Sequence, residues 1–486
     1  MTLAFFTRVA LRRPTLRRPA TALALAASVL AGACADRLTE PNLNQPGLGT
    51  ATADPNFVQF AASGILAQQR NSLDDFVRNV GIFGRENYNY TQTEGRNTSG
   101  YLATFTDPSS FSAGSNWFTH YANLRNIFNF NNFVEQAPAT LLTDTQKNAA
   151  RGFSATMEAL ELHYVIATRH NIGAVVEIRE DPLDLAPFVP RDSVYGYIVA
   201  RLDAGAQALA QGGAAFPFTL TTGFAGFNTP TTFRQFNRAL AARVQVYRGS
   251  LGCGVPCYQQ ALAALGESFI DPAGPLDRGV YAVYSTAAND QINAANTFGG
   301  AARVIVAHPS VANEFLRKPD GTPDNRYAAK FTTLATPVNA PGTNIGIPTQ
   351  IGLRIYPTQD ARVPIIRNEG LILLRAEARY FTGNVAGAVE DLNTIRTRSG
   401  GLAPITAADV STRDQFVTEL LTQRRFSLYQ EGHRWVDVRR FGRLNTLPVD
   451  LPTHSVAEQA VVPQQECLSR TQLGADLPSS CPRPQN

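Results

Sequence analysis

Six histidines and two closely spaced glutamates are the residues with which this chain could perform acid–base or metal chemistry. The histidines are spread along the sequence as His120, His163, His170, His308, His433 and His454. The seven-residue spacing of His163 and His170 is more typical of a packed helix than of a metal ligand pair. Glu158 and Glu161 lie three residues apart and could face a partner, but such acids more often form ion pairs with arginine. No nucleophile elbow, phosphate-binding loop or dinucleotide fingerprint occurs, so the sequence predicts no enzyme, no metal site and no cofactor.

The first of five cysteines stands where a lipid anchor is expected. Five arginines between Arg8 and Arg18 precede a short apolar stretch, residues 20–29, and then the small residues that lead to Cys34. A basic segment, an apolar segment and small residues before a cysteine are the order found in lipoprotein signal peptides. We therefore expect residues 1–33 to be removed and Cys34 to carry lipid.

The other four cysteines form two close pairs in the sequence. Cys253 and Cys257 flank Gly-Val-Pro, and Cys467 and Cys481 flank a stretch of the C-terminal tail without apolar periodicity. An even number of cysteines in an exported chain favours two local disulfide bonds. Zinc is the alternative, but neither pair has the two-residue spacing of common zinc knuckles and no histidine accompanies them.

The charge balance argues against nucleic acid as a partner. The chain holds 43 basic and 39 acidic residues, but the expected signal peptide contains five of the arginines and no acid. The mature chain would have 38 basic residues against 39 acidic ones, and therefore a net charge of −1. No basic run with interleaved aromatic residues remains, so nucleic-acid binding is not indicated. After Cys34 no stretch approaches the roughly 20 apolar residues of a membrane helix, which leaves the lipid as the membrane contact.

Apolar periodicity predicts a mainly α-helical chain with one large domain. A polar tether, residues 34–55, precedes a single domain over residues 56–486. Helical periodicity is expected in residues 57–73, 117–134, 146–170, 191–211 and 258–269, with another helix capped by Thr231 and Thr232. We place helix pairs at about 146–270 and 362–442. The Gly-, Pro- and Asn-rich regions at about 84–116 and 271–361 are expected to form long irregular loops over this helical scaffold.

The segment around residues 362–442 contains the most informative pattern. Leu373, Ala376 and Tyr380 follow helical spacing, Gly383-Asn384 breaks the helix, and a second periodic segment ends at Ile395. Such a helix–turn–helix unit with small alanines at facing positions looks like a tetratricopeptide-type pair.

A cluster of charged residues follows this helix pair. Glu431, His433 and Asp437 could form a catalytic or ligand site. The other reading places Asp437, Arg439 and Arg440 in a buried ion-pair network around Trp435, which would lock the last helix to the helix pairs. We favour the second reading.

The same cluster resembles a known family. Arg424-Arg425, Glu431-Gly432-His433-Arg434-Trp435, Asp437 and Arg439-Arg440 are similar to the C-terminal signature of the SusD/RagB family. Further resemblances are the Asn- and Pro-containing leader at residues 35–55, the segment from Trp117 to Leu124, the helix from Arg151 to Arg169, and Asp324-Asn325-Arg326. The tail after Arg443 does not resemble the family.

This resemblance implies a fold and a function. SusD/RagB proteins are lipid-anchored, mainly helical substrate-binding proteins of outer-membrane nutrient uptake. The resemblance implies an outer-membrane, surface-exposed protein that captures an oligo- or polysaccharide and delivers it to a SusC-like TonB-dependent channel. An oligopeptide is the alternative ligand, because both tryptophans fall in expected helices and no exposed tryptophan platform is indicated. A helical-repeat adaptor without a small ligand and a secreted hydrolase with an unrecognised site remain as other classes.

Tyrosines and amides in the two loop regions are the best candidates for ligand binding. Aromatic faces stack on the apolar faces of sugars, and amides or charged groups bind the hydroxyls. We therefore predict a site where the 84–101 loop meets the 284–303 loop. Its candidate residues are Tyr88, Asn89, Tyr90, Asn97, Tyr101, Tyr284, Asn293 and Arg303. The alternative is that these tyrosines pack onto the helices.

Overall fold

Local capping signals determine where the long helices begin. In the computed structural model, Thr143 caps α6 (Asp144–Arg169) and forms a reciprocal capping box with Gln146. Thr229 does the same with Thr232 for α8 (Pro230–Arg248), in which proline takes the first helical position. The cap is therefore Thr229 and not the predicted Thr231-Thr232 pair, because proline at the first turn fits the helix and leaves the cap to the residue before it.

The structure describes residue 54 and residues 56–481, except residue 105 and residues 109–114 and 297–303. Residues 1–33, Cys34 and nearly all of the tether lie outside this part, so the signal peptide and the lipid site stay predictions. Residues 55–486 group into one compact unit by their contacts.

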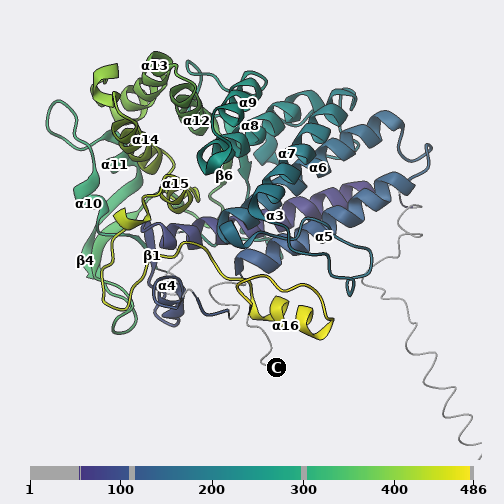
Figure 1. The fold of residues 1–486 in the computed structure, drawn as a ribbon, viewed down its shortest axis with the longest axis horizontal. Coiled ribbons are helices and arrows are strands. Elements are labelled where there is room, and N and C mark those ends of the chain that lie inside the picture. Colours follow the sequence, from purple (N-terminus) through teal and green to yellow (C-terminus); the bar gives the residue numbers. More distant parts are fainter. Residues whose placement is uncertain (1–53, 55, 105, 109–114, 297–303, 482–486) are drawn as a thin grey trace, which may run out of the picture. The chain divides into compact units, whose positions relative to one another are not determined.

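Most described residues lie in helices that pack on their neighbours in sequence. The α-helices are α3 (Phe57–Phe83), α4 (Arg96–Leu102), α5 (Ser115–Gln136), α6, α7 (Arg191–Ala210), α8, α9 (Val255–Gly266), α10 (Val311–Glu314), α11 (Asn325–Lys330), α12 (Asn368–Phe381), α13 (Val385–Ile395), α14 (Arg413–Ser427), α15 (Arg434–Arg440) and α16 (Gln464–Gln472). Figure 1 shows the long helices following one another in an arc from α5 through α9 and α12 to α14. The mainly α-helical fold predicted from the sequence is confirmed.

Small residues allow the helices of this arc to approach closely. Gly152 on α6 faces Gly205 on α7, and a Cβ atom at Gly152 would lie 3.0 Å from the carbonyl oxygen of Gly205. The predicted turn between α12 and α13 also forms as expected. Gly383 has φ +91°, and the Asn384 side chain caps α13 by accepting a hydrogen bond from the Gly387 amide at 2.9 Å.

The two regions expected to be irregular loops also contain the short strands of a β-sheet. Its strands are β1 (Asn87–Asn89), β3 (Ile305–Ala307), β5 (Thr349–Leu353) and β4 (Phe331–Val338), hydrogen-bonded in that order. A second, two-stranded sheet pairs β2 (Gly279–Ala282) with β6 (Val363–Arg367). The sequence did not predict these strands, because they are short and β1 pairs with β3 across more than 200 residues of sequence, which leaves no local pattern.

A buried chain of charges joins three helices and includes Asp437 and Arg440, as the favoured reading of the C-terminal cluster predicted. Arg439, which was also expected in the ion-pair network, instead donates to the carbonyls of Ala167 and Glu458. Asp437 on α15 accepts from Arg424 Nε on α14 at 2.7 Å and from Arg440 Nε at 3.0 Å. Arg440 also reaches Glu377 on α12, with its Nη2 donating to Oε2 at 2.6 Å. Trp435 is fully buried, and its Nε1 donates to the Ala457 carbonyl at 2.7 Å. The cluster is therefore a scaffold feature.

A second set of buried ion pairs ties the sheet region to α14. Arg367 at the end of β6 pairs with Glu431 at 2.7 Å and with Glu369. Arg326 on α11 binds Asp324 and donates to the Ser427 hydroxyl on α14 at 2.8 Å. The segments that cover the helices are therefore anchored to them through charge-assisted hydrogen bonds.

Both predicted cysteine pairs are disulfide-bonded. Cys253 and Cys257 have Cα atoms 5.8 Å apart, and those of Cys467 and Cys481 are 5.5 Å apart. Bonded in this way, the four sulfurs are not free thiolates for zinc. In the described part of the chain, no group of three or more His, Cys, Asp or Glu residues is arranged to hold a metal ion. No helix there is long and apolar enough to cross a membrane.

We expect Glu377→Ala to lower the free energy of unfolding by about 3–5 kcal/mol, because it leaves Arg440 buried without its main partner. The matched control is Glu267→Ala, which removes the partner of Arg234 from a pair whose carboxylate side chain is 46% exposed. That change should cost at most about 1 kcal/mol. Urea unfolding of the three proteins measures both values, and equal costs would contradict the role assigned to the buried pair.

Candidate ligand-binding site

Tyr88 of β1 and Tyr90, which follows the strand, pack inside the protein. Tyr88 and Tyr90 are both 0% exposed, and their rings stack with centroids 5.0 Å apart. The Tyr88 hydroxyl donates to Asp450, and the Tyr90 hydroxyl donates to the Ile347 carbonyl at 2.7 Å. The prediction that these rings form an exposed platform was wrong, because every face that could stack on a ligand is already used in the interior.

Tyr101 and Tyr284 are also buried, at 3% and 7% exposure. Tyr101 packs edge-on against Phe83 of α3, with ring centroids 5.2 Å apart. The Tyr284 hydroxyl donates to the Arg70 carbonyl of α3 at 2.7 Å. The two tyrosines therefore pack on α3, and neither offers a free ring face to a ligand.

The predicted amides are used to hold the chain in place. Asn293 donates to the Ala361 carbonyl at 2.7 Å, and the Asn89 side chain accepts from the Thr91 hydroxyl at 2.7 Å. Asn97 is half-buried in the first turn of α4. Arg303 lies outside the described residues. The structure thus gives Asn89 and Asn293 structural roles.

Electrostatics explain why Tyr88 is held so firmly. Asp450 accepts from Tyr88 and from His308 Nε2 at 2.8 Å. Burial opposes ionisation of Asp450, but these two hydrogen bonds outweigh it and hold the pKa of its carboxyl below the ordinary value. Burial and the neighbouring Asp450 raise the pKa of Tyr88, so the phenol stays neutral. This is a structural hydrogen-bond network between β1, β3 and the C-terminal segment.

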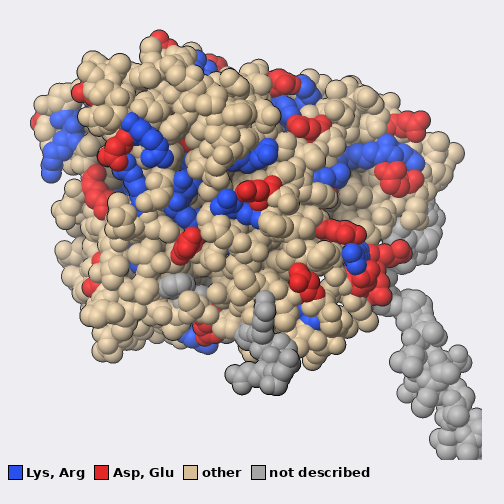
Figure 2. Space-filling view, in the orientation of Figure 1, with Lys and Arg blue, Asp and Glu red and all other residues tan. Residues whose placement is uncertain are grey.

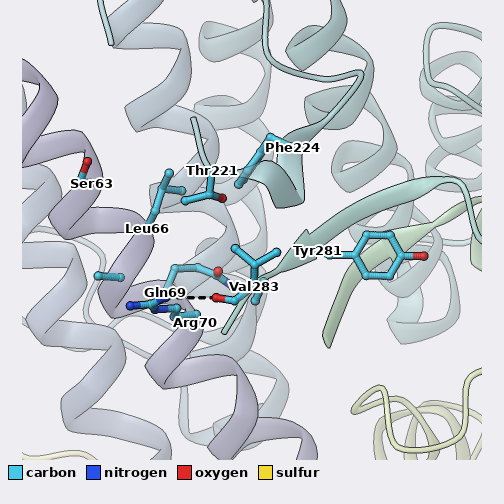
Figure 3. Close-up of a pocket in the computed structure, with 10 residues that line it drawn as sticks. Ser63, Leu66, Gln69, Arg70, Thr221, Phe224, Tyr281 and Val283 are labelled. Carbon is cyan, nitrogen blue, oxygen red and sulfur yellow. Dashed lines mark hydrogen bonds between the residues drawn. The ribbon is translucent and has the colours of Figure 1, made fainter. Parts of the chain in front are cut away.

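A pocket next to the predicted 284–303 loop is the better candidate. It encloses about 220 Å³ between α3, the 3₁₀ turn η4 (Thr222–Phe224) and β2. Figure 3 shows Ser63 and Leu66 on α3 across from Thr221 and Phe224, whereas the Tyr281 ring points away from the cavity. β2 therefore offers its backbone and Val283 to the pocket, and Phe224 is the aromatic residue at its wall.

Arg70 links this pocket to the adjacent loop. Its Nη1 donates to the Val283 carbonyl at 3.2 Å, and its Nη2 pairs with Asp290. The neighbouring Asp74 carboxylate accepts from the Ala294 amide at 2.7 Å. α3 therefore holds the segment from Val283 to Ala294, of which Val283 lines the pocket.

The pocket offers unused hydrogen-bonding capacity. Gln69 is buried in its wall, and its Nε2 has no hydrogen-bond partner among the described residues. Exposed Thr221 contributes a hydroxyl at the same opening, and so does exposed Ser63, whose hydroxyl accepts from Gln59 Nε2 at 2.9 Å and keeps its own hydrogen to donate. With Leu66 and Phe224 beside them, these groups suit a ligand that combines hydroxyls with apolar C–H faces. Sequence reasoning missed them because Ser63, Gln69 and Arg70 read as ordinary helix residues.

A second cavity contains Glu158, one of the acids singled out in the sequence. It encloses about 260 Å³ between α5, α6 and α7. Glu158 accepts from the Tyr197 hydroxyl at 2.6 Å and pairs with Arg201 at 2.9 Å. Glu161 is fully buried and accepts from His120 at 2.6 Å and Asn123 at 2.7 Å. Both acids already have their partners, so the cavity at α3 remains the stronger candidate.

The comparisons with known proteins agree with this helical architecture. Residues 356–471 match the SusD family, and no curated protein is similar enough to count as a relative. Among solved structures, a SusD superfamily protein from Bacteroides vulgatus matches with a TM-score of 0.62 at 14% identity, over 86% of this chain and 97% of its own. NanU from B. fragilis matches with a TM-score of 0.63 at 14% identity, over 92% of this chain and 100% of its own.

These findings define first a helical SusD-like fold. The match of residues 356–471 to the SusD family confirms the resemblance predicted from the sequence. One detail is corrected: the family match extends past Arg443 to residue 471, so much of the C-terminal tail belongs to the family segment.

We expect Tyr88→Ala to lower the free energy of unfolding by about 3–5 kcal/mol, because it leaves a cavity beside Tyr90. The matched control, Tyr88→Phe, keeps the ring and removes only the hydroxyl that donates to Asp450. It should cost about 1–3 kcal/mol. Thermal or urea unfolding distinguishes the two, and an unchanged stability of Tyr88→Ala would mean that the ring is exposed after all.

Proposed function

We propose that this protein is a non-enzymatic, lipid-anchored substrate-binding protein that captures an oligo- or polysaccharide at the outer membrane. It delivers the ligand to a SusC-like TonB-dependent channel. An oligopeptide is the second candidate ligand. The observation that carries the proposal is the SusD-family match of residues 356–471 within a SusD-like fold.

Family membership supports the binding role and the location. SusD-family proteins are binding proteins and are associated with the outer membrane in general. One structural neighbour, from Bacteroides vulgatus, is provisionally designated a sugar-binding protein, and it matches with a TM-score of 0.57 at 18% identity over 80% of this chain and 86% of its own. A saccharide is therefore the first ligand to test.

The pocket at α3 supports a neutral, hydroxyl-rich ligand. Its opening carries the hydroxyls of Ser63 and Thr221, Gln69 lies buried in its wall with an unpartnered amide nitrogen, and Arg70 is already paired with Asp290. Stacking and hydrogen bonds of this kind contribute on the order of 1 kcal/mol each, so we expect a modest affinity for a single saccharide unit.

Calorimetry against a panel of polysaccharides and peptides tests the function, and Ala67→Trp tests the site. Ala67 is an exposed residue at the pocket, so tryptophan there should fill the opening without disturbing the core. We expect the bound saccharide to lose at least about tenfold in affinity. The control Ala263→Trp places the same ring on an exposed position of α9 and should bind normally.

The outcomes separate the function from the site. Binding that survives Ala67→Trp would place the ligand elsewhere and leave the function standing. A panel in which only peptides bind would favour the second ligand class. A protein that binds neither class would favour the helical-repeat adaptor, and turnover of a panel member would indicate the hydrolase.

Lipid attachment at Cys34 makes a separate prediction. Mass spectrometry of the membrane fraction should find diacylglyceryl on Cys34 and no residues 1–33, and Cys34→Ala should move the protein to the soluble periplasm. The native protein should co-purify with a large barrel protein from detergent-solubilised outer membranes, since a lasting assembly needs an interface above roughly 2,000 Å². An equal distribution of the native protein and Cys34→Ala between membrane and periplasm would contradict the lipid anchor. A native protein that always elutes alone in mild detergent would contradict the channel partner.

A further inference from the structure

A third pocket lies where α10, α14, α15 and the turn η8 (Leu444–Thr446) meet. It encloses about 280 Å³ and is lined by three arginines, Arg425, Arg434 and Arg443, and three threonines, Thr418, Thr422 and Thr446. Figure 2 shows basic side chains gathered over α14 and α15 on this face. None of these residues belongs to the candidate pocket at α3.

Two of the arginines are buried without enough hydrogen-bond partners. Arg425 is 4% exposed; its Nη1 pairs with Glu314 and its Nη2 donates to the Ser310 hydroxyl at 3.2 Å, whereas its enclosed Nε has no partner among the described residues. The Arg434 side chain is 12% exposed, its Nε likewise has no partner there, and its nearest paired carboxylate oxygen, on Glu314, is 3.9 Å away. Burying a guanidinium without matching acceptors is costly. The two side chains are therefore placed to gain strongly from an added anion.

The acids near these arginines do not supply that anion in full. Glu314 contacts both guanidiniums, but its side chain is 36% exposed and belongs to the four-residue helix α10. Asp414 pairs with Arg443 at 2.5 Å. Glu86 lies behind the arginines, where burial raises the pKa of its carboxyl. The three arginines thus share two salt-bridge partners at the pocket, Glu314 and Asp414.

Burial also disfavours the charged form of Arg425 and Arg434. Burial and the adjacent Arg434 lower the pKa of Arg425 to about 9. Two neighbouring guanidiniums that disfavour each other's charge are stabilised when a carboxylate lies between them, and the planar fork of each group matches the two oxygens of a carboxylate. The hydroxyls of Thr418, Thr422 and Thr446 already donate to backbone carbonyls, and Thr418 also accepts from Arg443. Those of Thr422 and Thr446 can still accept hydrogen bonds from hydroxyl groups of the ligand.

We propose that this pocket binds the carboxylate of a small, hydroxyl-bearing ligand, namely a sugar acid, with Arg425 and Arg434 holding the carboxylate and the threonines facing the hydroxyls. Glu314 occupies part of the anion position in the empty pocket and moves aside on binding. The inference rests on the proposed function only in choosing a sugar as the carrier of the carboxylate, since the charge argument stands without it.

Calorimetry with D-glucuronate and D-glucose on the whole mature chain tests the proposal, because the two sugars share a ring and differ in the carboxylate. Glucuronate should bind and glucose should not. Arg434→Gln should weaken glucuronate at least about tenfold, as expected for a lost charge-assisted pair. Glu314→Gln should strengthen it several-fold, because it removes the competing internal carboxylate. Opposite effects from two residues in contact would not follow from a loss of folding.

Steric blocking keeps the test valid if Arg434→Gln folds poorly. Thr446→Trp leaves all three arginines in place and should close the opening, so glucuronate binding should disappear. The matched control is Thr397→Trp, since Thr397 is also exposed and its hydroxyl likewise donates to a nearby carbonyl, that of Asn393. This variant should bind glucuronate as the native protein does.

Two further arms identify the source of the carboxylate and separate this site from the saccharide site. N-acetylglutamate carries carboxylates without sugar hydroxyls and should bind more weakly than glucuronate. Equal binding would overturn the assignment to a sugar acid. Ala67→Trp should leave glucuronate unaffected, so a failure of neutral saccharides to bind would count against the proposed function alone. Absence of glucuronate binding to both the native protein and Glu314→Gln would overturn the inference.

Discussion

The buried charge chain from Arg424 through Asp437 and Arg440 to Glu377 is the interaction on which the rest of the structure depends. It connects α14, α15 and α12 by hydrogen bonds between side chains that are almost without solvent contact. Each charge has lost its hydration, so each is stable only while its partners stay in position. Arg439 extends the connection to the N-terminal half, since it donates to the Ala167 carbonyl of α6 at 2.5 Å and lies over the Trp435 ring. Helices that are distant in sequence thereby acquire one fixed arrangement.

The helices and this network could be predicted from the sequence because their signals are local. Helical periodicity, the Gly383-Asn384 break and the spacing of Trp435, Asp437 and Arg440 are each contained within a few helical turns of sequence. The sheet β1–β3–β5–β4 could not be predicted in this way. In the sequence, β1 precedes α5 to α9, whereas the other strands of the sheet follow them. β1 itself contributes three residues, too few for an alternating pattern. Strand pairing of this kind is decided by the tertiary fold and leaves little trace in the sequence.

The same reason explains why the predicted binding tyrosines proved to be interior residues. Tyrosines among asparagines in a glycine-rich stretch are typical of an exposed recognition loop, but β1 lies in the sheet and Tyr88 faces the His308–Asp450 pair. Asp450 is more than 350 residues from Tyr88, so the partner that buries the ring cannot be seen from the loop itself. Conversely, Ser63 and Gln69 appear as unremarkable positions on a long helix, and they become a candidate site only because η4 and β2 pack against α3.

The distribution of arginine in the fold argues that charge here has two distinct uses. Where a guanidinium has its full set of acceptors, as Arg440 has with Glu377 and Asp437, it fixes helices and has no capacity left for a ligand. Arg425 and Arg434 lie on the same two helices, α14 and α15, yet they share one partly exposed glutamate and keep unpaired nitrogen atoms. The neighbouring network fixes the two helices and therefore the backbone positions from which the two guanidiniums extend. A scaffold built on buried ion pairs can in this way hold two incompletely paired guanidiniums beside a pocket, preorganised for an anion.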